Sequence, residues 1–322
     1  MSGAPHPTVA DVAVARDRIA PFVRRTPLRR SAALSAMAGA DVWLKLESEQ
    51  ETGSFKLRGA ANTLTQLDEA SRQAGVVAVS SGNHGRAVAH MGRELGVDIT
   101  ICISSRVPDV KVDAMRALGA ELVVAGPDQD DADAAARELV DRGRTFVHPF
   151  DDPRVIAGQG TIGLEILEER PEIDRILVPL SGGGLAGGLA VAAVGAKPSI
   201  EVVGVSQELG PAMYDSIEAG RLVDVVEEDT LADALAGGLG PVNHHSFELC
   251  RTLLSDTVLV SEDQIADAMA WLSREEGLTV EGGGAVGVAA VLAGKAGGGA
   301  ETAIVVSGGN VGAATMERVL AR

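Results

Sequence analysis

Three apolar segments of this chain each lead into a glycine-rich polar turn and then into a helix-like stretch. The apolar segments cover residues 75–79, 176–180 and 302–306 and are rich in valine and isoleucine, as expected of buried strands. The turns that follow cover residues 80–85, 181–185 and 307–311. Strands that alternate with helices in this way predict an α/β protein with mostly parallel sheets, whose ligands bind at the carboxyl ends of the strands.

Lys56 lies in an unusual setting for a lysine, within residues 52–60, which read Thr-Gly-Ser-Phe-Lys-Leu-Arg-Gly-Ala. A helix is predicted over residues 57–67 with Ser54 as its cap, so Lys56 would sit at the positive end of the helix dipole. A lysine that is destabilised as a cation is a usable amine, which Schiff-base chemistry requires. The alternative is an ordinary solvated lysine at a helix end.

The second of the three turns predicts a phosphate site. It consists of Ser181, Gly182, Gly183, Gly184 and Leu185. Successive glycines that open a helix form a nest of backbone N–H groups for an anion. No Gly-Lys-Ser/Thr follows, so this is not a nucleotide P-loop, and the lack of a clean Gly-x-Gly-x-x-Gly disfavours nicotinamide binding. Together with Lys56, the nest implies a ligand that carries both a phosphate and an aldehyde.

The other two turns carry polar side chains. Ser80, Ser81, Asn83 and His84 lie in the first turn, where hydroxyl, amide and N–H groups at a helix start suit a carboxylate or a phenolate oxygen. Ser307 opens the last turn and could face the ring nitrogen of a cofactor. Taken alone, each turn is also consistent with an ordinary connection between a strand and a helix.

Together these segments resemble the fold-type-II pyridoxal-phosphate enzymes, specifically the serine/threonine dehydratase and serine racemase group. The resemblance runs nearly end to end and rests on motifs in the family's order. Besides the three turns, they are Arg25-Thr26-Pro27-Leu28, Lys45-Leu46-Glu47, residues 54–60, Val147-His148-Pro149-Phe150, residues 156–161, Thr230-Leu231-Ala232-Asp233 and residues 281–287. The resemblance implies two open, twisted, mostly parallel-sheet domains of the tryptophan synthase β-like fold, with pyridoxal 5′-phosphate in the cleft between them.

The resemblance also implies roles for the candidate residues. Lys56 would hold the cofactor as a Schiff base and act as base on one face of its ring, with Ser81 on the opposite face. Phe55 would pack against the ring, while Asn83 would bond its 3-hydroxyl and Ser307 its pyridine nitrogen. Because the hydroxyl of Ser307 is neutral, the ring would be a weaker electron sink than one paired with a carboxylate, which suits β-elimination.

The remaining implied contacts concern the phosphate and the substrate. Residues 181–185 would bind the phosphate through backbone N–H groups. The substrate carboxylate would be bound by Ser80, Ser81, Asn83 and His84.

The leading functional interpretation is an ammonia-lyase that converts L-threonine, L-serine or a related 3-hydroxy amino acid to a 2-keto acid and ammonia. The alternatives are an amino-acid racemase, a β-replacement synthase and a non-catalytic pyridoxal-phosphate-binding protein. Three departures weaken the racemase: Ser206 and Ala212 occupy its metal-ligand positions, residues 128–131 are acidic where it has an arginine, and the loop 236–240 is bare of polar side chains. Glu208 or Asp215 could substitute, but neither matches, so no metal is predicted.

Composition favours a cytoplasmic metabolic enzyme. The net charge of −17 disfavours nucleic acid and anionic membranes as partners. The longest apolar stretch, residues 182–196, is shorter than the roughly 20 residues that a bilayer requires, and the first residues do not resemble a secretory signal. Cys102 and Cys250 do not suggest a disulfide framework or a metal site.

The expected domains are a discontinuous large domain of residues 1–74 and 151–322 and a small domain of residues 75–150. The small domain would contain strands at 76–80, 99–103, 121–124 and 145–147. The family resemblance implies a homo-oligomer, either a dimer or a tetramer.

Overall fold

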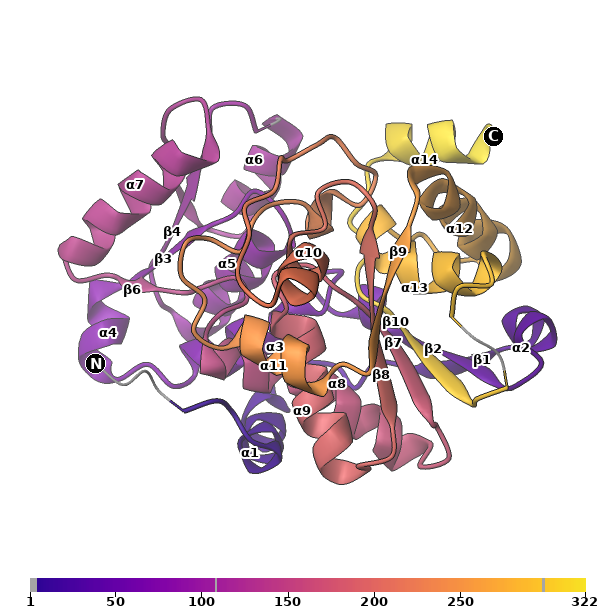
Figure 1. Ribbon diagram of the computed structural model, residues 1–322. Coiled ribbons are helices and arrows are strands. Elements are labelled where there is room, and N and C mark those ends of the chain that lie inside the picture. The colour runs from indigo at the N-terminus through magenta and orange to yellow at the C-terminus, as the bar shows by residue number, and fades with distance from the viewer. Residues whose placement is uncertain (1–4, 108, 297–298) are drawn as a thin grey trace.

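In the computed structural model, which describes residues 5–107, 109–296 and 299–322, strands and helices alternate along most of the chain (Figure 1). The strands are β1 (Leu28–Ser31), β2 (Val42–Leu46), β3 (Val76–Val79), β4 (Ile99–Ile103), β5 (Glu121–Val124), β6 (Thr145–Phe146), β7 (Arg175–Pro179), β8 (Glu201–Gln207), β9 (Asp256–Val260) and β10 (Thr302–Val306).

The helices of the first half are α1 (Val9–Ile19), α2 (Ala32–Ala38), α3 (Lys56–Leu64), α4 (Glu69–Ala74), α5 (Asn83–Leu95), α6 (Asp109–Ala117), α7 (Gln129–Asp141) and α8 (Pro153–Glu169). Those of the second half are α9 (Gly184–Ala196), α10 (Ala212–Ala219), α11 (Ser246–Leu253), α12 (Glu262–Glu275), α13 (Gly282–Leu292) and α14 (Ala313–Leu320). Two short 3-10 helices are η1 (Glu47–Glu49) and η2 (Asp233–Leu235).

The strands form two separate sheets (Figure 1). The larger has six strands in the order β1-β2-β10-β7-β8-β9, and the smaller has four in the order β5-β4-β3-β6. Every pairing between these strands is parallel except that of β1 with β2. The predicted α/β class with two mostly parallel sheets is therefore confirmed.

Helices cover both faces of the larger sheet (Figure 1), as alternate residues of β10 show. Ile304 and Val306 pack in a core with α12 and α13, whereas Ala303 and Val305 pack in a second core with α8 and α9. Side chains alternate between the two faces of a strand, so these helix pairs lie on opposite faces. A strand buried on both faces is apolar throughout, which is why 302–306 was recognisable in the sequence.

Helices α8 and α9 pack with their backbones in close approach. A Cβ added at Gly160 of α8 would lie 2.6 Å from the carbonyl oxygen of Gly188 in α9. A Cβ at Gly188 would in turn overlap the carbonyl oxygen of Ile156. The small residues of α9 are therefore required by this packing, and the helix is buried on nearly all sides.

The smaller sheet is covered in the same manner. Val76 and Ala78 of β3 pack in a core with α3 and α5, and Val77 and Val79 pack in another core with α7. Helix α3 therefore connects the two sheets, because it also packs against α8 through Gly59, where a Cβ would meet the side chains of Gln159 and Val155.

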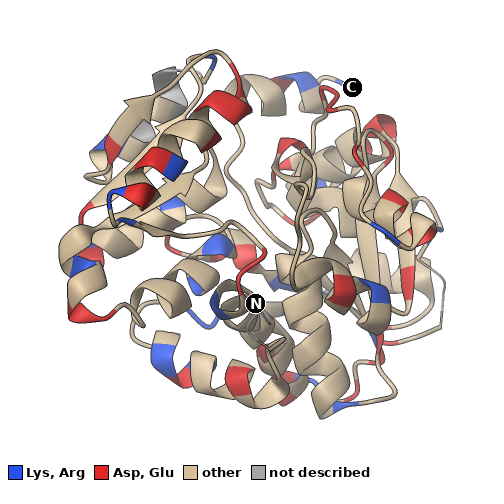
Figure 2. Ribbon diagram, turned by 60° about the vertical axis from the view of Figure 1, so that its left-hand side comes forward, with Lys and Arg blue, Asp and Glu red and all other residues tan. Residues whose placement is uncertain are grey.

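Acidic and basic residues alternate along the outer helices in the view of Figure 2, without a continuous basic stretch in that view. Among the residues that the structure describes, no helix has both the length and the apolar character that a membrane span requires.

Candidate active site

The turn that follows β10 holds the start of α3. Lys56 is the first residue of α3, and Phe55 before it already has helical backbone angles, with φ −56° and ψ −22°. No side chain caps the helix, so the predicted cap at Ser54 is wrong. Ser54 instead pairs with Gly308 in an antiparallel bridge, and the N–H of Phe55 donates to the carbonyl of Ser307 at 3.0 Å. These bonds fix Lys56 beside the carboxyl end of β10.

The amine of Lys56 faces the segment that follows β6. Its Nζ donates to the carbonyl of Pro149 at 2.7 Å and lies 5.2 Å from the centre of the Phe55 ring. Burial lowers the pKa of this amine to about 8, and the nearby carboxylate of Glu281 opposes the shift only in part. Desolvation is thus the cause visible in the structure, where the sequence suggested the helix dipole. An amine with this pKa is partly neutral, and therefore nucleophilic, near neutral pH.

Asn83, the first residue of α5, is held in place at both ends of its amide. Its Nδ2 donates to Glu281 at 2.7 Å, and its Oδ1 accepts from Asn310 at 2.7 Å. Asn310 is fixed in turn by the carbonyl of Thr52 and by the guanidinium of Arg86, at 2.9 and 2.6 Å. An amide has two donors and two lone pairs, so Asn83 retains hydrogen-bonding capacity for a ligand.

The other residues of this turn lie between β3 and α5. His84 donates from Nε2 to the carbonyl of Val147 at 2.9 Å, and burial, together with the Lys56 charge, lowers its pKa to about 3. Ser80 accepts the N–H of Gly82 at 3.2 Å through its hydroxyl, and Ser81 is half-buried. The structure thus brings Asn83 and His84 close to the lysine: Asn83 donates to Glu281, whose charge acts on Lys56, and the charge of Lys56 acts on His84.

The glycine turn begins α9, as predicted, but the helix already starts at Gly184. Gly183 has a φ of +83°, which favours glycine, and a Cβ there would lie 2.5 Å from the methyl group of Met213. A Cβ at Gly182 would overlap the ring of Phe150. Since no side chain caps α9, the N–H groups of its first turn remain available to an anion.

Ser307 is buried at the end of β10, where its hydroxyl lies 3.5 Å from the carbonyl of Gly283 in α13. Three groups at the site were not assigned from the sequence: the carboxylate of Glu281, the carbonyl of Pro149 and the amide of Asn310. Each lies in a motif quoted above or in the turn 307–311. Their place within these motifs was therefore the feature of the sequence that could have identified them.

Comparison with known proteins decides the family. Residues 19–308 match the family model described as pyridoxal-phosphate dependent enzyme. The chain belongs to this family.

Individual relatives narrow the resemblance within these pyridoxal-phosphate enzymes. The L-threonine ammonia-lyase of Thermotoga maritima is 41% identical over 97% of this chain and 78% of its own. The catabolic L-threonine dehydratase TdcB of Escherichia coli is 39% identical over 94% of this chain and 93% of its own. The structure of maize serine racemase has a TM-score of 0.92 at 33% identity and covers 98% of each chain. The predicted resemblance to the dehydratase and racemase group is confirmed.

The residues present fit pyridoxal phosphate. The cofactor carries an aldehyde and a phosphate on one ring, so it requires an amine and an anion site a short distance apart. Lys56 and the glycine turn are linked by a single dipeptide: Pro149 accepts from Lys56, and Phe150 packs against Gly182. The amine has a lowered pKa and the first turn of α9 has no side-chain cap.

A network of buried charges lies behind Lys56 in the layer between α3 and α8. Arg58 donates to Glu47 through Nε and Nη2, both at 2.8 Å, and to Glu165 through Nη1 at 2.6 Å. Lys45 donates to Glu165 at 2.6 Å, so two cations face two carboxylates. Although burial favours the neutral acid, the Arg58 guanidinium holds the pKa of Glu47 below its usual value. Lys45, Glu47 and Arg58 come from motifs whose role the sequence left open.

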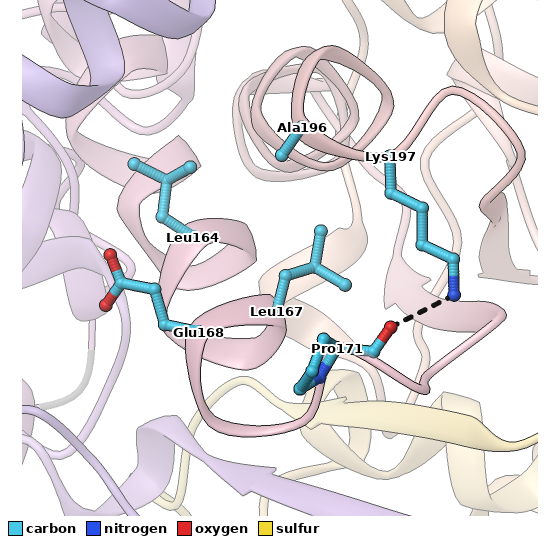
Figure 3. A pocket seen from close by; sticks show the side chains of 6 residues that line it. All are labelled: Leu164, Leu167, Glu168, Pro171, Ala196 and Lys197. Carbon is cyan, nitrogen blue, oxygen red and sulfur yellow. Dashed lines mark hydrogen bonds between the residues drawn. The ribbon is translucent and has the colours of Figure 1, made fainter.

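The surface pocket in Figure 3 is separate from this site. Its volume is about 380 Å³, and it lies where the ends of α8 and α9 meet the surface. It is lined by Leu164, Leu167, Glu168, Pro171, Ala196 and Lys197. The Lys197 amine donates to the carbonyl of Pro171 at 3.1 Å, and neither Lys56 nor the glycine turn lines the pocket.

Proposed function

We propose that this chain is a pyridoxal-phosphate-dependent ammonia-lyase that converts L-threonine, L-serine or a related 3-hydroxy amino acid to a 2-keto acid and ammonia. The observation that carries the proposal is the amine of Lys56, whose pKa is lowered to about 8, beside an uncapped, glycine-opened helix. The relatives named L-threonine ammonia-lyase and L-threonine dehydratase support this substrate class, because they match over most of their length.

Lys56 is the residue proposed to perform the proton transfer. When bound, pyridoxal phosphate withdraws electrons from the α-carbon of an amino acid and so makes its proton acidic. Lys56 would hold the aldehyde of the cofactor and, as a free amine, would accept the Cα proton of an L-substrate at Nζ. Its lowered pKa keeps a share of the amine neutral for this task. The β-hydroxyl would then leave as water, balanced by the proton that Lys56 had accepted from Cα, and water would hydrolyse the released enamine to the keto acid and ammonia.

The remaining candidates are proposed to hold the cofactor and the substrate. Phe55 would pack against the ring, Asn83 would bond the 3-hydroxyl and Ser307 the ring nitrogen. The phosphate would be bound by Ser181, Gly182, Gly183, Gly184 and Leu185, and the substrate carboxylate by Ser80, Ser81, Asn83 and His84. The contact of Asn83 with Glu281 supports its role, because it orients the amide before any ligand binds.

A racemase is the second candidate, favoured by the likeness to maize serine racemase. Racemisation requires a proton donor on the ring face opposite Lys56, and Ser81 would be that residue. In the lyase direction Ser81 is not the base. The Ser81→Ala variant should therefore lose any racemase activity while it retains much of its activity as a lyase on L-substrates.

The domain division, assembly and location are also proposed. The four-stranded sheet would form the core of a small domain of residues 75–150, and residues 1–74 and 151–322 would form the large domain. The pairing of β3, β4, β5 and β6 within one sheet supports this division. The enzyme would act in the cytoplasm as a dimer or tetramer.

The test is to incubate the purified protein with a panel of 3-hydroxy amino acids, as both enantiomers, and to measure keto acid, ammonia and enantiomer formation. Keto acid and ammonia from L-threonine or L-serine are expected from the parent protein, and the Lys56→Ala variant should form neither. Enantiomer formation without keto acid would favour the racemase. Full activity of Lys56→Ala would refute the assignment of the site.

A further inference from the structure

The segment from Val147 to Asp151 contacts His84, Lys56 and the glycine turn of the candidate site, and also the start of α11. Through Val147 and Pro149, its carbonyl groups accept from His84 at 2.9 Å and from Lys56 at 2.7 Å. At the other end of the segment, the carboxylate of Asp151 accepts the N–H groups that open α11, at 2.6 to 2.8 Å, from His244, His245 and Ser246.

Phe150 in the same segment shapes the glycine turn. A Cβ at Gly182 would overlap its ring, and a Cβ at Gly184 would lie 2.6 Å from its carbonyl oxygen. Helix α11 contributes from the other side, because Cys250 lies 3.5 Å from the carbonyl of Gly183. The conformation of residues 147–151 therefore sets the position of the glycine turn relative to Lys56.

His148 holds this segment in a turn. Its Nδ1 accepts the backbone N–H of Phe150 at 3.2 Å and that of Asp151 at 2.8 Å. The ring also packs edge to face against Phe146 and Phe150, with ring centres 5.9 and 4.6 Å apart. A nitrogen that accepts two N–H groups carries no proton, so the neutral ring is protonated on Nε2.

The surroundings of His148 favour this neutral form. Burial lowers its pKa to about 4, and the charge of Lys56 acts in the same direction, as does that of His244. Asp151 and Asp152 oppose the shift but do not overcome it. The acceptor at Nδ1 is thus retained at neutral pH.

We propose that His148 is a positioning residue, whose Nδ1 folds the turn that sets the carbonyl of Pro149 against Lys56 and the ring of Phe150 beneath the glycine turn. The inference rests on the proposed function of Lys56 and the glycine turn. His148 touches neither reacting atom in this scheme; it acts through its neighbours in the chain. Loss of the turn would displace both the carbonyl of Pro149, which accepts from Lys56, and Phe150, which packs against the glycine turn.

Two variants of matched polarity test the proposal. In His148→Asn the Oδ1 atom can occupy the place of Nδ1 and accept the same N–H groups, as asparagine does in Asx-turns. In His148→Gln the carbonyl oxygen is one bond farther from the backbone and cannot close the same turn. Cofactor binding is measured by titrating cofactor-free protein with pyridoxal phosphate, and folding is checked by thermal unfolding.

His148→Asn should bind the cofactor within about threefold of the parent, and His148→Gln should bind it about tenfold or more weakly, since two partly buried N–H groups lose their acceptor. Equal affinity of the two folded variants would overturn the proposal.

A nitrogen-15 NMR spectrum of the parent holoenzyme provides a second measurement that does not require a variant to fold. The ring of His148 should show an unprotonated Nδ1 and a protonated Nε2 from about pH 6 to 8. A protonated Nδ1 would overturn the proposal. Because neither readout depends on turnover, an enzyme that fails the amino-acid panel would refute the proposed function without deciding the role of His148.

Discussion

Lys56 differs from a surface lysine because its amine ends among protein atoms, where a positive charge is poorly solvated. A buried ammonium releases its proton more readily than one in water, and this accounts for a pKa of about 8 in place of the usual value of 10.5. The nearby carboxylate of Glu281 restores only part of the lost stabilisation. The lysine therefore gains nucleophilic character from its position alone.

A pH dependence follows from this residue. Only the neutral amine can attack the aldehyde of the cofactor, so capture of pyridoxal phosphate by cofactor-free protein should slow about tenfold per pH unit below pH 8. The rate should level off above pH 8 rather than near the value of a free lysine. Stopped-flow absorbance measures the rate, with Lys56→Ala as the control that forms no covalent product. A midpoint near 10.5 would contradict the burial of the amine.

At the scale of elements, two helix starts define the site, and each depends on close packing. Helix α9 begins directly after Gly183, whose φ of +83° and crowded surroundings exclude a side chain. Helix α3 begins at Lys56, and its fully buried Arg58 anchors it through bonds to Glu47 and Glu165. The start of α9 exposes backbone N–H groups to a ligand, and the start of α3 fixes the position of the Lys56 amine relative to these groups.

Gly183→Val should weaken cofactor binding by about tenfold or more, because its Cβ would collide with Met213 and its backbone would resist a positive φ. Gly39→Val is the matched control, since Gly39 at the end of α2 has a φ of +70° and open space around it. The control should lose about 1–2 kcal/mol of stability and retain its affinity for the cofactor. Titration with pyridoxal phosphate measures the affinity, and urea unfolding measures the stability. If Gly183→Val bound the cofactor as tightly as the parent, the phosphate site would lie elsewhere.

Arg58→Met should reduce the free energy of unfolding by about 3–5 kcal/mol, because it leaves Glu47 and Glu165 buried without their main cation. The exposed pair of Arg251 with Glu248 on α11 serves as a control. Arg251→Met should cost less than about 1 kcal/mol, as is usual for surface ion pairs. Urea unfolding of the three proteins decides the matter, and similar losses in both variants would contradict the structural role of the network.

For the molecule as a whole, two histidines, one buried and one half-buried, make the fold sensitive to acid. Burial lowers the pKa of His84 to about 3 and that of His148 to about 4, whereas both protonate near 6.5 in the unfolded chain. Between these values the unfolded chain binds more protons, so the free energy of unfolding falls as the pH drops below about 6.5.

The acid sensitivity can be measured with His148→Asn, which does not titrate. Between pH 6.5 and pH 5, His148 should account for about 1.5 kcal/mol of lost stability, so this variant should lose that much less than the parent. Urea unfolding at the two pH values gives the comparison. An unchanged loss in the variant would contradict the buried, neutral state of His148.

Local patterns predicted the strands better than the helix starts. The expected strands at 99–103, 121–124 and 302–306 agree with β4, β5 and β10. Strands β4 and β10 are runs of buried, mostly branched residues with clear ends, whereas β5 is an edge strand that is only partly buried. Helix α5 begins at Asn83 and α9 at Gly184, which is three and two residues before the helical stretches expected after their turns. Asparagine and glycine have low helix propensity, so the sequence did not mark these starts.

The contacts of the site were harder to foresee than its residues. The cap at Ser54 was wrong because a strand-like bridge to Gly308 replaces it. Asn83 and Glu281 are separated by 198 positions, and Lys56 and Pro149 by 93, so only the folded chain brings them together. The motifs identified the family and most of the candidate residues; the three-dimensional structure supplied the partners that orient them.

The central position of β10 in the larger sheet affects how the protein folds during its synthesis. Strand β10 follows the other nine described strands in the sequence but lies between β2 and β7, and the turn after it secures the start of α3 through Ser307 and Gly308. While the chain is still being translated, the growing protein thus has a gap in its main sheet, and the start of α3 lacks its bonds to Ser307 and Gly308. We therefore expect firm cofactor binding only after residues 302–308 have left the ribosome and joined the sheet, when nearly all the described residues have been made.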